Sequence, residues 1–139
     1  MQHRFEYLDH TADAGIVAWG ADLKEAFASA AYAMFTVLAD LDQVEESEEL
    51  GVMATAGDVE GLLVEWLNEL VYIFETEHLL LRRFDIIELS GSNLKALVYG
   101  EEFDITKHTL RTGIKAVTYH MLEVAKDGDD YKVQVILDI

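Results

Sequence analysis

The strongest constraint on the folding of this chain is an apolar run at its end, where Val135, Ile136 and Leu137 precede Asp138 and Ile139. A short, partly β-branched run of this kind indicates a buried strand and not a frayed tail. It would hold the Asp138 side chain and the α-carboxylate of Ile139 side by side at a fixed point of the fold. The sequence therefore predicts a final strand over residues 131–139 that ends in two carboxylates.

A compact polar cluster lies near the other end of the chain, between two apolar stretches. It consists of Asp9, His10, Thr11, Ala12 and Asp13. Calcium and magnesium prefer oxygen ligands, which clustered carboxylates supply. If the two chain ends meet, Asp9, Asp13, Asp138 and the Ile139 carboxylate would form a site for a hard cation. Aspartates in a turn often serve only turn hydrogen bonds, so that structural role is the alternative.

Local patterns predict the helices and strands. Apolar residues at three- and four-residue spacing indicate helices over residues 22–39 and 58–78, each opened by a capping aspartate. Alternating or β-branched segments indicate strands, namely residues 4–8, 16–19, 50–57, 79–89, 94–99, 114–125 and 131–139. Residues 90–93 and 126–130 have the composition of hairpin turns. Residues 40–49 look like an acidic linker, and residues 100–113 like a polar connection.

This order of elements predicts the fold class. Strands followed by alternating helices, and then by consecutive strands, are typical of an α+β protein. We expect a mostly antiparallel β-sheet or sandwich with two packed α-helices, in one compact domain over residues 1–139.

The charge of the chain limits its partners. The 10 Lys and Arg residues face 27 Asp and Glu residues, for a formal net charge of −17. A phosphate backbone is bound by basic residues, so we expect no high-affinity nucleic-acid binding. An acidic surface suits a basic partner or a cation, and it also serves solubility alone. The absence of cysteine excludes thiolate chemistry. No signal-peptide pattern or apolar stretch of membrane length is present, so we expect a cytoplasmic protein without membrane contact.

Three further polar residues are candidates for contacts. His10 suits a ligand, an acid–base group or a turn residue. Lys115 enters an apolar strand, where it could pair with a carboxylate, reach an acid of a partner or remain a solvated edge residue. His120 lies in the same strand, and its role is open in the same way as that of Lys115. No phosphate-binding loop, nucleophile elbow or nucleophile–base pair is present, so we expect no catalytic activity from the protein alone.

Several motifs, in the same order, resemble the archease family along the whole chain. Residues 7–16, Tyr-Leu-Asp-His-Thr-Ala-Asp-Ala-Gly-Ile, resemble its opening signature. Residues 18–20, 23–27 and 33–35 are similar to its next strand and first helix, and residues 97–101 to its tyrosine-glycine-acid segment. Residues 115–120, Lys-Ala-Val-Thr-Tyr-His, and the final Asp138-Ile139 resemble its later motifs.

This resemblance implies a function. Archeases are partners of the RtcB-type RNA ligase of tRNA splicing and RNA repair. They promote guanylylation of the ligase, which uses GTP and manganese, and so support its multiple turnover. The resemblance implies a divalent-cation site at Asp13, Asp138 and Ile139, with calcium in the isolated protein and magnesium or manganese in the ligase complex. Asp9, His10, Lys115 and His120 are then candidate contacts to the partner or its nucleotide. A chaperone-like interaction module and a metal-dependent hydrolase are the alternatives.

Overall fold

The computed structural model describes residues 3–9 and 13–139 of the chain. The strands are β1 (Arg4–Asp9), β2 (Ala14–Gly20), β3 (Glu48–Thr55), β4 (Leu79–Leu89), β5 (Asn93–Glu102), β6 (Ala116–Asp127) and β7 (Asp130–Asp138). The helices are α1 (Leu23–Leu38), α2 (Val59–Glu77) and the short 3-10 helix η1 (Leu41–Gln43). The predicted elements are therefore present in the predicted order, with differences at their boundaries.

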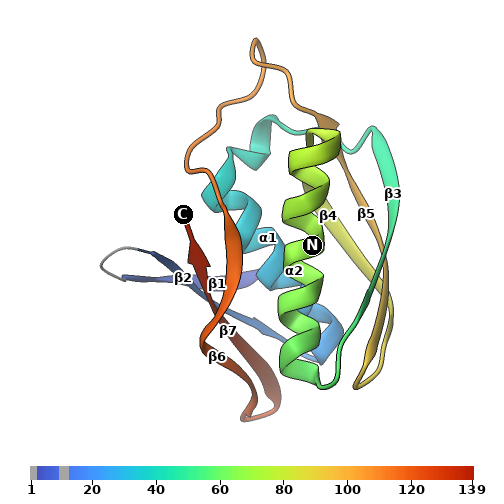
Figure 1. The fold of residues 1–139 in the computed structure, drawn as a ribbon, viewed down its shortest axis with the longest axis vertical. Coiled ribbons are helices and arrows are strands. Elements are labelled where there is room, and N and C mark those ends of the chain that lie inside the picture. Colours follow the sequence, from blue (N-terminus) through green and yellow to red (C-terminus); the bar gives the residue numbers. More distant parts are fainter. Residues whose placement is uncertain (1–2, 10–12) are drawn as a thin grey trace.

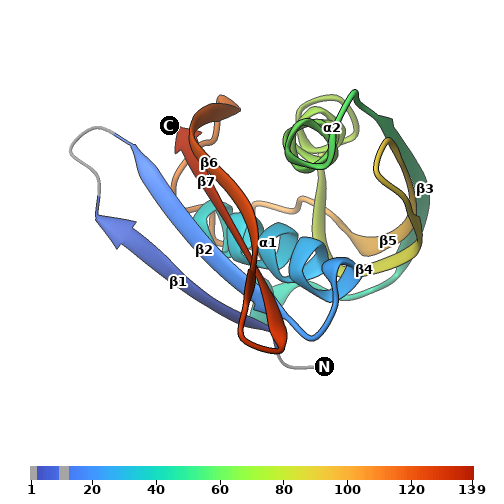
Figure 2. The same ribbon diagram turned by 90° about the horizontal axis from the view of Figure 1, so that it is seen from below.

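Two antiparallel sheets enclose the helices. One sheet has the order β1-β2-β7-β6 and the other has the order β3-β5-β4. Figures 1 and 2 show α1 and α2 between these two sheets. The predicted α+β class, with antiparallel sheets and two packed helices in one compact domain, is confirmed. Sequence patterns did not show that the strands divide into two sheets, because that division depends on which distant strands pair.

Aspartates begin both long helices, as predicted. A carboxylate oxygen of Asp22 accepts a hydrogen bond from the Glu25 N–H at 2.8 Å, and one of Asp58 accepts from the Gly61 N–H at 2.7 Å. These bonds satisfy backbone donors that the first turn of a helix leaves unpaired. The end of α2 is also well defined, because His78 adopts the left-handed conformation at φ 57° and its N–H bonds to the Phe74 carbonyl.

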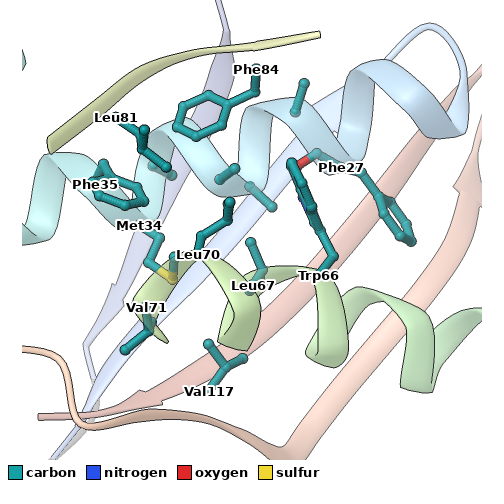
Figure 3. Packing of buried hydrophobic residues seen from close by; sticks show 14 of the residues in the cluster. Phe27, Met34, Phe35, Trp66, Leu67, Leu70, Val71, Leu81, Phe84 and Val117 are labelled. Carbon is teal, nitrogen blue, oxygen red and sulfur yellow. The ribbon is translucent and has the colours of Figure 1, made fainter. Parts of the chain in front are cut away.

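The hydrophobic core lies where the two helices meet each other and the sheets. Trp66 of α2 is fully buried against aromatic and aliphatic residues of α1 and β4, and Figure 3 shows this packing. Its indole N–H donates to the Phe27 carbonyl of α1 at 3.1 Å, so the buried ring leaves no polar group unpaired. The ring of Phe84 from β4 meets Trp66 edge-on, with centroids 6.4 Å apart. The core therefore joins both helices to the second sheet.

The predicted linker at residues 40–49 is more structured than expected. Leu41 and Val44 are buried, and η1 lies between α1 and β3. Glu48 and Glu49 belong to β3, where they face Gly100 and Tyr99 of β5. The acidic composition suggested a solvated linker, but pairing with β5 extends the strand into it. Residues 100–102 of the predicted polar connection likewise belong to β5.

Asn68 of α2 fastens the beginning of β6. Its side-chain carbonyl accepts from the Val117 N–H at 2.8 Å, and its amide NH₂ donates to the Val117 carbonyl at 3.2 Å. Val117 lies on an edge strand, whose outer backbone groups have no strand partner in this sheet. The amide of Asn68 therefore takes the place of a neighbouring strand at this residue.

Among the described residues, no helix is long and apolar enough to cross a membrane.

Candidate metal site

Antiparallel pairing of β2 with β7 brings the two chain ends together. Ala14 lies opposite Leu137 in this pairing, so the next residues along the two strands are Asp13 and Asp138. Figure 2 shows the C-terminus close to the beginning of β2. The predicted approach of the two acidic segments is thus a consequence of the strand register.

On its other side, Asp138 adjoins the beginning of β6. Ala116 lies opposite Asp138, and the Lys115 N–H donates to the Asp138 carbonyl at 2.8 Å. The predicted strand over residues 114–125 begins only at Ala116, because its partner β7 ends at Asp138. Lys115 is exposed beside the carboxyl end of β7. Asp138 therefore lies between Asp13 and Lys115 along this edge of the sheet.

The three predicted ligands differ in exposure. Asp138 is exposed, Asp13 is partly buried, and Ile139 follows the last strand with 37% of its surface exposed. Their donor set would be two side-chain carboxylates and one terminal carboxylate, all hard oxygen ligands that suit calcium, magnesium or manganese. Within residues 3–9 and 13–139, no group of three or more acid or histidine side chains is placed to hold a metal ion.

The remaining candidate residues are spread around this site. Asp9 ends β1 and pairs with Ala14, which places its backbone one strand away from the β2–β7 junction. His10 lies outside the described residues. His120 lies in a bulge of β6, where the register shifts between Thr118 and Glu123.

This bulge gives β6 an unusual local conformation. Met121 has a φ of 53°, a left-handed backbone that costs energy for a residue with a side chain. Its carbonyl accepts from the Gln134 side-chain amide at 2.9 Å, which helps to hold the bulge. Tyr119 and Met121 are 63% and 50% exposed. The motif over residues 115–120 therefore carries exposed side chains beside the candidate metal site.

A groove beside Asp13 was not found from the sequence. It has a volume of about 390 Å³, and its lining includes Tyr7, Asp13, Thr36, Arg111 and Thr112. Backbone bonds from the Arg111 and Thr112 N–H groups to the Leu38 and Val37 carbonyls fasten this segment to the end of α1. The sequence predicted residues 100–113 only as a polar connection and did not indicate that this segment lines a groove. The one sequence feature that could have suggested a functional role was Arg111, in a chain with only 10 basic residues.

A network within the same connection orders the segment that leads to Arg111. The ring of His108 is buried, its Nδ1 accepts from the Asp104 N–H at 2.9 Å, and its Nε2 lies 2.8 Å from a Glu101 carboxylate oxygen. Because Nδ1 accepts, Nε2 carries the proton and donates to Glu101. The Lys107 ammonium, with the Glu45 N–H and His108, lowers the pKa of Glu101 to about 2.

Comparison with known proteins identifies the family. A model of the archease protein family matches residues 5–139. The chain belongs to the archease family. It is 41% identical to the protein archease of Methanosarcina mazei, over 98% of this chain and 96% of that protein. The archease of Sulfolobus acidocaldarius is 39% identical, over 98% and 99% of the two chains.

Solved structures agree with the family assignment. The solution structure of a protein from Methanobacterium thermoautotrophicum has a TM-score of 0.83 and 43% identity, and the match covers 97% of this chain and 98% of that one. A crystal structure from Thermotoga maritima, described as an archease and possible chaperone, has a TM-score of 0.63 at 23% identity, with both chains fully covered. The second likeness concerns the fold alone. The recognition of an archease from its motifs is confirmed.

Proposed function

We propose that this archease activates an RtcB-type RNA ligase in tRNA splicing and RNA repair. The observation that carries the proposal is the β2–β7 register, which brings Asp13 and Asp138 together at the end of the chain. In the proposed site these carboxylates and the α-carboxylate of Ile139 hold a divalent cation. When bound, the cation would stabilise negative charge on the phosphates of a nucleotide.

The residues around the site have roles that follow from their positions. The backbone bond from Lys115 to Asp138 positions the last residues for binding. The Lys115 side chain carries a positive charge at the same edge, where it suits a nucleotide phosphate or an acid of the ligase. Binding energy from the ligase would then orient the nucleotide relative to the histidine that is guanylylated. The protein contributes position and charge, and the ligase contributes the nucleophile.

The negative charge of this protein supports its association with a basic enzyme. A ligase that binds RNA needs a basic surface, and opposite charges favour their association. An activator with a net charge of −17 would not compete with the ligase for RNA. This division leaves RNA binding to the ligase.

The decisive experiment measures the ligase–GMP adduct. A matched RtcB-type ligase is incubated with GTP and manganese, with and without this protein, over multiple turnovers. We expect faster adduct formation with the protein, and loss of that effect in the folded variants Asp13→Ala and Asp138→Ala. Equal adduct formation with and without the protein would refute the proposal. Turnover of GTP or RNA by the protein alone would instead support a hydrolase.

A second candidate is a chaperone-like interaction module. It is favoured by the exposed apolar side chains of Met53, Ile105 and Met121, and by the description of the Thermotoga maritima structure as a possible chaperone. Such a module would protect unrelated unfolded proteins from aggregation without a metal ion. Suppression of aggregation that is unaffected by a chelator and by Asp13→Ala would favour this candidate.

A further inference from the structure

An aromatic groove adjoins the groove at Asp13 and lies between β1 and the outer side of α1. Its volume is about 430 Å³, and the residues that matter here are Phe5, Tyr7, Tyr32, Asp40, Asp42 and Arg111. The two grooves share Tyr7, Thr36 and Arg111, so they form one elongated depression. β1 is an edge strand of its sheet, and Figure 2 shows it at the margin of the molecule. A partner can therefore reach this depression from outside.

Aromatic rings form one wall of this groove. His3, Phe5 and Tyr7 alternate along the beginning of the chain and share one face of the sheet. The centroid of the Phe5 ring lies 5.6 Å from that of Tyr7 and 6.0 Å from that of Tyr32. Tyr7 is 55% exposed, and its hydroxyl lies 2.5 Å from the Thr36 hydroxyl oxygen, which anchors the ring to α1. The wall therefore offers ring faces that are held in place, and such faces attract cations.

The groove is electrostatically suited to a positive group. The C-terminal end of α1 borders it, but the carbonyls of residues 35–38 all accept hydrogen bonds, two of them from Arg111, so the negative charge of the groove comes from side chains. Asp40 and Asp42 add two carboxylates, and Asp42 is exposed. One oxygen of Asp40 accepts from the Asp42 N–H at 3.1 Å.

The positive groups in the groove do not reverse this balance. The guanidinium of Arg111 donates to the Thr36 carbonyl at 3.1 Å, and its single positive charge offsets only one of the two negative charges of Asp40 and Asp42. Burial lowers the pKa of His3, which favours its neutral form. A phosphate would therefore meet two carboxylates and a single guanidinium. The groove is better suited to a cation than to a nucleotide or RNA.

We infer that the aromatic groove binds an extended, arginine- or lysine-rich segment of a protein partner. The aliphatic stem of such a side chain can lie along the rings while its charged head reaches Asp40 or Asp42. The elongated shape suits an extended segment and not a single side chain. The inference goes beyond the proposed metal site, because it adds a second contact surface that continues to Asp13. It does not require the partner to be a ligase.

The test measures peptide binding to the full-length protein. A short fluorescein-labelled peptide of alternating Arg and Ala is titrated with the protein, and fluorescence anisotropy is recorded. A peptide with Glu in place of Arg serves as the control for charge. We expect the Arg peptide to bind and the Glu peptide not to bind. Binding should weaken as salt rises toward 0.15 M ionic strength, where charges are screened beyond about 8 Å.

Two variants locate the binding in the groove. We expect Asp42→Asn to weaken peptide binding by about two- to fivefold, as the loss of an exposed charge pair does. Tyr7→Leu removes a ring face and should weaken binding by about the same factor. The matched control is Glu65→Gln, which removes the same charge from an exposed position on α2 and should leave binding unchanged. Thermal melts check that each variant is folded.

The outcomes separate this inference from the proposed function. Equal binding of the Arg and Glu peptides, or full binding by Asp42→Asn, would each overturn the inference. None of these results would affect the ligase–GMP measurement, which depends on Asp13 and Asp138. Conversely, selective peptide binding that is weakened in Asp42→Asn and unchanged in Glu65→Gln would support the groove even if the protein did not activate a ligase.

Discussion

Replacement of Asn68 by Ala tests whether the two hydrogen bonds between the Asn68 side chain and Val117 of β6, here called the Asn68 clamp, stabilise the protein. The change removes both hydrogen bonds to Val117, at 2.8 Å and 3.2 Å, and leaves the Val117 N–H and carbonyl at the edge of the sheet without their partner. The beginning of β6 adjoins Asp138, so the clamp also supports the candidate metal site. The substitution leaves the acidic ligands themselves in place.

The expected cost follows from two opposing effects. Each intramolecular hydrogen bond contributes about 0.5–1.5 kcal/mol to the free energy of unfolding, so two bonds contribute about 2 kcal/mol. Alanine has a higher helix propensity than asparagine, and this difference adds about 0.5 kcal/mol to the free energy of unfolding. The loss of the bonds is the larger effect, and we expect a net destabilisation of about 1.5 kcal/mol. For a chain of this length, that lowers the melting temperature by about 5 °C.

Urea unfolding and hydrogen exchange measure this prediction. The midpoint in urea should fall with an unchanged slope, and the Val117 amide should exchange faster than in the wild type. Glu65→Ala is the matched control, because Glu65 is exposed on the same helix. Unchanged stability together with unchanged protection of the Val117 amide would refute the idea that Asn68 stabilises this edge.

Three further predictions concern the site and its surroundings. Asp13→Ala should abolish specific binding of calcium or manganese in calorimetry while the protein stays folded; unchanged affinity would count against the site. A C-terminal extension should impair activation of the ligase more than an N-terminal extension. Deletion of Ile139 should also impair activation, because it moves the terminal carboxylate by about 3.3 Å. Full activation by the C-terminally extended protein would exclude that carboxylate as a ligand. The ion pair with Lys107 lowers the pKa of Glu101 from 4.5 to about 2, so its contribution to stability is present above pH 4.5 and is lost as the pH falls toward 2. Urea unfolding across this range should show a smaller pH dependence in Glu101→Gln, and an identical dependence in both proteins would contradict the assignment.

Most helix and strand positions were predictable because their causes are local. The caps of α1 and α2 lie within three residues of the N–H groups that they bind, so Asp22 and Asp58 could be identified from spacing alone. Apolar periodicity located both helices. Boundaries were less certain where pairing decided them. Glu48 looked like part of a linker but lies in β3 because Gly100 lies opposite it.

The metal site at the two chain ends stays a prediction, and the groove beside it was not predicted. The carboxylates at both chain ends suggested oxygen ligands, and the motifs suggested the family. Arg111 could not be placed, because the groove that it lines is built from β1, β2, α1 and the segment before β6. The clamp of Asn68 on Val117 joins residues 49 positions apart, and no local pattern marks it.

The sequence by itself determined most of the local conformation, because capping and periodicity depend on residues close together in the chain. It also determined the acidic character, which is a matter of composition, and the family, because the motifs are read from the order of residues without the fold. Only the tertiary structure decided that β2 pairs with β7 in the register that brings Asp13 to Asp138. It also decided that Phe5 and Tyr7 of β1 line one groove together with Tyr32 and Thr36 of α1. These arrangements depend on strand pairing and core packing across the whole chain, where many distant contacts together select one register.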